Sequence, residues 1–196
     1  MKNRKALEVV PHIPIKGLIF GVLTNRTSID SNSVKLLANV IRQLVQNQCV
    51  VVIPENDKIL GIPEFRSILF NSEEELASSI LNGEMVETEK PGVQIMRMGS
   101  PSDYVETITS LGATGASLLL LFSDAPIALS GHPFIPTVRM GSKPSKSGMV
   151  DVLTTEGEEA VYRKIENVLS RREKTKVEEK RLTDFQILRT MNGFSL

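Results

Sequence analysis

Short runs of apolar residues alternate along this chain with longer segments of helical periodicity. The apolar runs span residues 17–24, 49–55, 92–99, 117–123 and 135–141, and residues 149–153 form a last short one. Parallel strands that are buried on both faces are typically continuous apolar runs, and helices connect them in this alternating order. The pattern therefore predicts an α/β fold with three layers, in which helices cover both faces of a mainly parallel, Rossmann-like open sheet.

The segments between these runs predict the helices. They span residues 30–48, 64–70, 72–84 and 102–111, and a last helix is expected to begin at Thr154 or Thr155. The longest of them places Val34, Leu37, Val40, Ile41, Leu44 and Val45 on one face at helical spacing. Asp30 or Ser31 is expected to cap this helix, and Ser72 to cap a shorter one, because their side chains can accept hydrogen bonds from free backbone amides.

The domain organisation follows from length. A chain of 196 residues can build one sizeable core, so we expect a single α/β domain over residues 1–196. Residues 1–15 read as an N-terminal extension. Residues 171–196 mix charges of both signs before an apolar end, and we expect this tail to pack back onto the domain.

Composition argues against several classes of partner. Lys plus Arg and Asp plus Glu both number 23, so no net charge attracts nucleic acid or an anionic membrane. The one cysteine, Cys49, excludes an internal disulfide and a multi-cysteine zinc site. No stretch approaches the roughly 20 apolar residues that span a bilayer. We expect a cytoplasmic protein that binds neither nucleic acid nor membrane.

Polar residues gather where the predicted strands end. The carboxyl ends of parallel strands share one edge of the sheet, where ligands bind. The candidates for binding a small polar ligand there are Asn25, Arg26, Thr27, Ser28, Ser31, Ser123, Asp124 and His132. Glu55 and Asp57 are candidate bases or metal ligands. Plainer roles remain open: a helix cap and turn for residues 25–33, loop carboxylates for the two acids, and a turn for His132.

Familiar nucleotide and hydrolase motifs are missing. The glycines near the first strand do not form G-x-G-x-x-G, so a dinucleotide site is not supported. The chain also lacks G-x-x-x-x-G-K-[ST] and a G-x-S-x-G elbow after a strand. The chemistry must therefore be sought elsewhere.

From about Leu18 onward, the order of motifs resembles the C-terminal part of the altronate and galactarate dehydratases, sugar-acid hydro-lyases often labelled altronate hydrolase. The segments that carry the resemblance are "NRTS" with "SN" after the first strand, "CVVVIPEN", "ITSLGATGASLLLLFSDAPIALSGHP", "IPTVRMGSK" and "SRREKTKVEEKRLTDFQI". The residues that match by position are Thr27, Ser31, Glu55, Thr175 and Glu178, with Arg139 in place of a strand lysine.

The chain departs from that family at its polar loops. The family's Gly-Gly-Ser-Asp loop has lost both glycines and its Asp, unless Asp30 substitutes for the carboxylate. A Gly-Arg-Gly-Thr corner has become residues 125–128, which removes an arginine suited to a carboxylate substrate. A Met-Asp of the family reads Met96-Arg97 here, which reverses the charge.

The resemblance implies dehydration of a hexonate or hexarate such as altronate or galactarate, with a divalent metal, iron or manganese. It then implies Glu55 as the base or metal ligand, and Arg26 and Arg139 as clamps for the substrate carboxylates. A companion chain would carry the missing family domains, or the protein would form a homo-oligomer. The alternative is a noncatalytic homologue that binds small acids or regulates, having lost the reaction centre.

Overall fold

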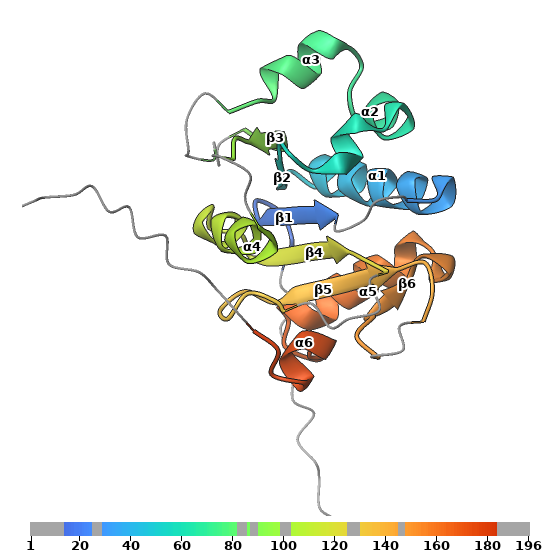
Figure 1. The fold of residues 1–196 in the computed structure, drawn as a ribbon, viewed down its shortest axis with the longest axis vertical. Coiled ribbons are helices and arrows are strands. Elements are labelled where there is room, and N and C mark those ends of the chain that lie inside the picture. The colour runs from blue at the N-terminus through green and yellow to red at the C-terminus, as the bar shows by residue number, and fades with distance from the viewer. Residues whose placement is uncertain are drawn as a thin grey trace, which may run out of the picture.

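The computed structural model describes residues 14–24, 29–81, 86, 90–98, 103–124, 130–144 and 148–183. These residues form a six-stranded sheet with the order β3-β2-β1-β4-β5-β6, and every neighbouring pair is parallel (Figure 1). The strands are β1 (Ile19–Thr24), β2 (Val50–Pro54), β3 (Gly92–Met96), β4 (Leu118–Phe122), β5 (Thr137–Gly141) and β6 (Val152–Leu153). The predicted α/β fold with a parallel, Rossmann-like sheet is confirmed.

The helices lie close to their predicted positions. They are α1 (Ser31–Gln46), η1 (Lys58–Gly61), α2 (Pro63–Leu69), α3 (Glu73–Ser78), α4 (Tyr104–Ala113), η2 (Thr154–Glu156), α5 (Glu158–Leu169) and α6 (Lys176–Glu179). Asp30 caps α1 and Ser72 caps α3, as expected. The helix expected at Thr154 begins later, because Gly157 has a φ of +83° and separates the short turn η2 from α5.

Alternation along each strand divides the core between two faces. Phe20 and Val22 of β1 pack with α1 and α5, whereas Ile19 packs with Leu111 of α4 on the other face. Figure 1 shows α4 on one side of the strands and α1 and α5 on the other. Because both faces are covered, strands β2, β4 and β5 are buried at every residue.

The strand order reverses beside β1. The chain moves outward from β1 to β2 and β3, and then returns across the sheet through α4 to place β4 on the other side of β1. In open parallel sheets, the crevice at the carboxyl ends of the strands on either side of this reversal is where ligands bind. Thr24 of β1 and Phe122 of β4 are paired at this point.

The described part of the C-terminal tail packs back on the domain. Helix α6 contacts β5, and Val177 is buried. The backbone amide of Gly131 donates to the carbonyl of Leu182 at 2.8 Å, which holds the tail beside the segment that enters β5. Most of the expected extension, residues 1–13, and residues 184–196 of the tail lie outside the described residues. No helix in the described part of the chain is long and apolar enough to cross a membrane.

We expect Gly21→Val to lower the free energy of unfolding by about 1–3 kcal/mol, as overpacking of a core does. A Cβ on Gly21 would lie 2.5 Å from Cδ2 of Leu119 and 3.4 Å from Leu111. Gly61→Val is the matched control, since a Cβ there meets no atom within 4 Å. Urea denaturation measures both changes, and equal losses in the two variants would contradict this account of the packing between β1, β4 and α4.

Candidate functional site

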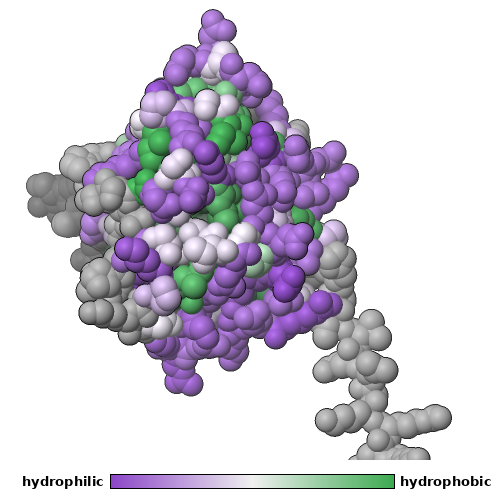
Figure 2. Space-filling model, turned by 90° about the vertical axis from the view of Figure 1, so that its right-hand side faces the viewer, coloured by the Kyte–Doolittle hydropathy of each residue, from purple (hydrophilic) through white to green (hydrophobic). Residues whose placement is uncertain are grey.

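The carboxyl edge of the sheet brings together the ends of β1, β2, β4 and β5. Figure 2 views the molecule from the side toward which β1 and β4 point in Figure 1. Hydrophilic residues cover most of this face, around an apolar patch and a band of residues of intermediate hydropathy. Because the strands are parallel, the polar residues that follow β2, β4 and β5 share one edge.

Asp57 binds the end of β1 to the loop after β2. One carboxylate oxygen accepts a hydrogen bond from the Thr24 amide at 2.6 Å, and the other accepts from the Thr24 hydroxyl and from the Ile59 amide at 3.0 Å. Asp57 is buried, and burial raises the pKa of its carboxyl although these three donors act in the opposite direction. The acid expected to be a base or metal ligand is thus held by backbone and hydroxyl donors.

Asp124 makes a similar connection between β4 and β5. Its carboxylate accepts from the Ser142 amide at 2.6 Å and from the Ser142 hydroxyl. The absence of a side chain at Gly141 makes room for it, since a Cβ there would lie 2.9 Å from Asp124 Oδ1. Ser123 is fully buried, and its amide donates to the Met140 carbonyl at 2.9 Å. Both predicted binding residues therefore join strand ends.

Glu55 serves the junction of β2 and β3. Its side chain accepts from the Met98 amide at 3.1 Å, and its own amide donates to the Met96 carbonyl at 2.9 Å. Its side chain is exposed. Glu55 follows β2, whereas Arg139 lies on β5, three strand positions away, which is about 14 Å at the usual strand spacing. The predicted base and the predicted clamp therefore do not face one small substrate.

An open groove of about 610 Å³ lies at the carboxyl edge beside β5 and β6. Its lining comprises Ile29, Asp30, Asn32, Ser142, Lys143, Thr154 and Thr155. The hydroxyl of Ser33 in α1 lies 3.2 Å from the hydroxyl of Thr154, which connects two walls of the groove. The groove thus offers hydroxyls, an amide, one carboxylate and one ammonium group, a set suited to a small polar ligand.

Arg139 lies inside the sheet rather than at its rim. It is the third residue of β5, its side chain has no exposed surface, and its Nε donates to the Ser123 carbonyl at 3.4 Å. Burial lowers the pKa of the guanidinium, while the negative charges of Asp124 and Asp151 act in the opposite direction. The expectation that Arg139 is an accessible clamp for carboxylates is wrong, because Arg139 lies in the middle of a strand that is buried at every residue.

The expectation that His132 lines the same rim is also wrong. Its amide donates to the hydroxyl of Thr137, the first residue of β5, at 3.4 Å, so it lies at the amino end of the sheet. The ring packs against Gly112 of α4, and its Nδ1 accepts from the Phe134 amide at 3.2 Å. The segment from β4 to β5 must run back along the sheet before a parallel strand can begin, which carries His132 to the opposite edge.

The first predicted corner is described only in part. Asn25, Arg26, Thr27 and Ser28 lie outside the described residues. Ser31 begins α1 and donates to Glu64 of α2 at 2.8 Å, so its hydroxyl serves helix packing. Its neighbour Asn32, which the sequence analysis did not select, lines the groove instead.

The described residues give no support to the divalent metal that the resemblance implies. Among them, no group of three or more His, Cys, Asp or Glu side chains is placed to hold a metal ion. The carboxylates of Asp57 and Asp124 accept hydrogen bonds from backbone and hydroxyl donors. No step through a metal is therefore derived from this part of the chain.

None of the residues that line the groove is among the predicted binding candidates, although Ile29, Asp30 and Asn32 belong to the polar segment 25–33. Lys143 lies in the polar segment that follows β5, whereas Thr154 and Thr155 were interpreted as the start of a helix. Their position at the end of β6 depends on the pairing of Gly141 with Leu153. A signal was available in Gly157, since a glycine directly before a helix with acidic residues in its first turn is a possible N-cap.

We expect Asp57→Ala to lower the free energy of unfolding by about 2–4 kcal/mol, because it leaves buried donors of Thr24 and Ile59 without an acceptor. Glu55→Ala is the matched control at the exposed neighbouring carboxylate, and we expect it to change stability by less than about 1 kcal/mol. Urea denaturation measures both. A neutral Asp57→Ala would show that the carboxylate does not join the two strand ends.

We expect His132 to make stability fall with acidification. Desolvation lowers the pKa of its imidazole in the folded state. The part of the stability that depends on a neutral His132 ring is therefore present above the ordinary histidine pKa of about 6.5. It is lost as the pH falls through that value toward the folded pKa. The stability of the wild type relative to His132→Gln should decrease from about pH 7.5 to about pH 5.5. A difference that grows over this range would contradict the burial of a neutral ring.

Comparison with known proteins leaves the function to be argued from the site. A scan against models of protein families and a search of curated proteins both found no match. The resemblance to altronate and galactarate dehydratases therefore rests on the order of the sequence motifs. A Rossmann-like sheet supports many unrelated activities, so the fold does not decide among them.

Proposed function

We propose that this chain binds a small hydroxylated carboxylic acid, of the hexonate or hexarate class, in the groove beside β5 and β6. The observation that carries the proposal is the set of polar side chains on three elements that line the groove: Asn32 of α1, Lys143 after β5, and Thr154 and Thr155 after β6. Its volume of about 610 Å³ lies within the usual range for ligand pockets, roughly 300–1,000 Å³.

The groups in the groove complement the parts of such an acid. The Lys143 ammonium group supplies a positive charge for a carboxylate, and the Asn32 amide and the two threonine hydroxyls can both donate to and accept from sugar hydroxyls. The carboxylate of Asp30 accepts from the amide and hydroxyl of Ser33, which holds it at the start of α1. A polyhydroxy acid would find a partner of the right kind along the groove.

Binding without turnover is the function that these contacts favour. Dehydration of a sugar acid requires a base beside the carbon that loses its proton and an acid at the departing hydroxyl. Glu55, expected as the base, follows β2, and Arg139, expected as a clamp, lies on β5, three strand positions away and without exposed surface. The noncatalytic homologue, acting in the cytoplasm as expected from the sequence, is therefore our first proposal.

Asp30 favours a second candidate, the hydro-lyase itself. Among the described residues that line the groove it is the one carboxylate, and Lys143 lines the same groove. In this scheme Asp30 would take the proton beside the substrate carboxylate, and Lys143 would assist the departing hydroxyl. Lys143 would donate a proton to that hydroxyl, so that it leaves as water, and the enol that remains would tautomerise to a keto acid. The two candidates therefore differ in whether the bound acid is consumed.

We expect galactarate and altronate to raise the melting temperature of the protein, because a ligand that binds only the folded state stabilises it. Lys143→Ala should weaken the affinity measured by titration calorimetry about five- to tenfold, the effect of losing one charged hydrogen bond at a solvent-accessible site. Lys16→Ala is the matched control, since Lys16 is exposed and precedes β1 at the opposite edge.

The outcomes separate the candidates. A melting temperature unchanged by both acids would overturn the binding proposal. Formation of a keto acid, assayed with and without added iron or manganese and abolished by Asp30→Asn, would select the hydro-lyase. Equal affinities of Lys143→Ala and Lys16→Ala would place the ligand outside this groove.

A further inference from the structure

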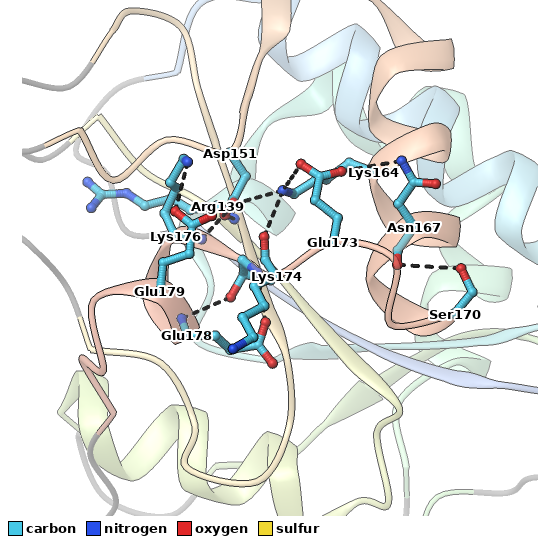
Figure 3. Close-up of polar contacts among 11 residues, drawn as sticks. Arg139, Asp151, Lys164, Asn167, Ser170, Glu173, Lys174, Lys176, Glu178 and Glu179 are labelled. Atoms are coloured by element: carbon cyan, nitrogen blue, oxygen red, sulfur yellow. Dashed lines mark hydrogen bonds and ion pairs between the residues drawn. The ribbon is translucent and has the colours of Figure 1, made fainter. Parts of the chain in front are cut away.

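A buried ionic network adjoins the start of β6, whereas the groove lies beyond the end of this strand. Figure 3 shows Asp151 and Glu173 on either side of the Lys164 ammonium group. Lys164 Nζ lies 3.4 Å from Asp151 Oδ1 and 2.6 Å from Glu173 Oε1, and it donates to the Lys174 carbonyl at 3.1 Å. The Asp151 side chain has no exposed surface, and that of Lys164 is 7% exposed.

Asp151 joins this network to the sheet and to α6. One carboxylate oxygen accepts from the Arg139 amide at 2.9 Å, and the other accepts from the Lys176 amide at 2.8 Å. Its own amide donates to the Arg139 carbonyl at 2.8 Å. A single buried carboxylate thus contacts β5, α5 and the first residue of α6, while its backbone leads directly into β6.

Strand β6 depends on such anchors because it is short. It has two residues, Val152 and Leu153, and pairs with β5 at two positions. Ladders of this length contribute little stability of their own. Asp151 fixes the start of β6, and the contact between the Thr154 and Ser33 hydroxyls fixes the residue after its end.

We infer that the Lys164 network couples the C-terminal segment 173–179 to the groove wall formed by Thr154 and Thr155. Glu173 neutralises Lys164 from the solvent side, with 46% of its side chain exposed. Loss of Glu173 leaves a nearly buried ammonium group with Asp151 as its charged partner, which changes the balance of charges around that carboxylate. Thr154 lies three residues beyond Asp151, about 10 Å along an extended chain, so a shift at the anchor reaches the wall.

This coupling gives the tail a regulatory role in the proposed binding site. A protein, an ion or a modification that draws Glu173 away from Lys164 would loosen the wall, and a ligand that fixes the wall would in turn hold the tail, since coupling between two sites is reciprocal. The regulatory role rests on the proposed function. The coupling itself does not, because it is a property of the unliganded chain.

Amide hydrogen exchange of the full chain tests the coupling without a ligand. In Glu173→Gln, we expect exchange over residues 151–157 to increase about two- to fivefold, the factor that loss of a partly exposed ion pair accounts for. Residues 19–24 of β1 should exchange as in the wild type. Glu179→Gln is the matched control, because Glu179 pairs with the Lys176 side chain at 2.8 Å in the same segment. In this variant, hydrogen exchange over residues 151–157 should stay as in the wild type.

Each outcome decides the inference. Unchanged exchange over residues 151–157 in Glu173→Gln would overturn the coupling. An equal rise of exchange in β1 would also overturn it, because it would report a global loss of stability. Equal effects of Glu173→Gln and Glu179→Gln would overturn it too. A selective rise, together with weaker galactarate binding in Glu173→Gln, supports both the coupling and its regulatory role. A selective rise without any galactarate binding to the wild type upholds the coupling and rejects the proposed function.

Discussion

Burial of the sheet on both faces is the constraint on which the rest of this structure depends. Helices cover each face, so the side chains along β2 and β4 are apolar, and polar groups emerge where the strands end. The backbone amides at these ends still require partners in a place from which water is largely excluded. Asp57 and Asp124 meet that requirement by accepting from Thr24 of β1 and from Ser142, which directly follows β5.

This use of carboxylates changes what the carboxyl edge can do. An acid that holds a neighbouring amide gains stability from the hydrogen bond, and moving it toward a ligand would leave that amide buried and unpaired. Asp57 and Asp124 are therefore better suited to shaping the edge than to chemistry. The exposed side chains of Lys143 and Thr155, beside β5 and β6, do not hold strand ends in this way. The candidate groove lies beside β5 and β6 because polar side chains that can contact a ligand line the edge there.

Local patterns predicted most of the fold. The apolar face of α1 and a cap at Asp30 or Ser31 could be predicted because both depend on residues within a few positions of each other, and the structure selects Asp30. The layers followed from the continuous apolar runs. The site was predicted less well, because it depends on which strands become neighbours. The separation of Glu55 from Arg139 is set by the order of the strands in the sheet, and nothing in the alternation of strands and helices specifies that order.

Arg139 and His132 failed as predicted site residues for a different reason. His132 was assigned by its place after an apolar run, and Arg139 by its match to a strand lysine of the dehydratase motifs. Neither pattern showed where β5 would begin. Strand β5 starts at Thr137, so Arg139 falls in its middle, and His132 lies at the opposite end. The match to a strand lysine implied an accessible guanidinium for Arg139, whereas the structure buries it against the Ser123 carbonyl.

Among the residues that match the dehydratase motifs, two have a role in folding that the structure explains. Thr175 and Glu178 form a reciprocal capping box at the start of α6, in which each side chain accepts from the backbone amide of the other residue. That pair specifies the helix whose first amide binds Asp151, so its role is explained by folding alone. The departures from the motifs fall in the polar loops instead. A chain that retains the positions needed for folding and changes those at the edge is expected to keep its architecture while altering what it binds or whether it reacts, because function belongs to the site and not to the fold.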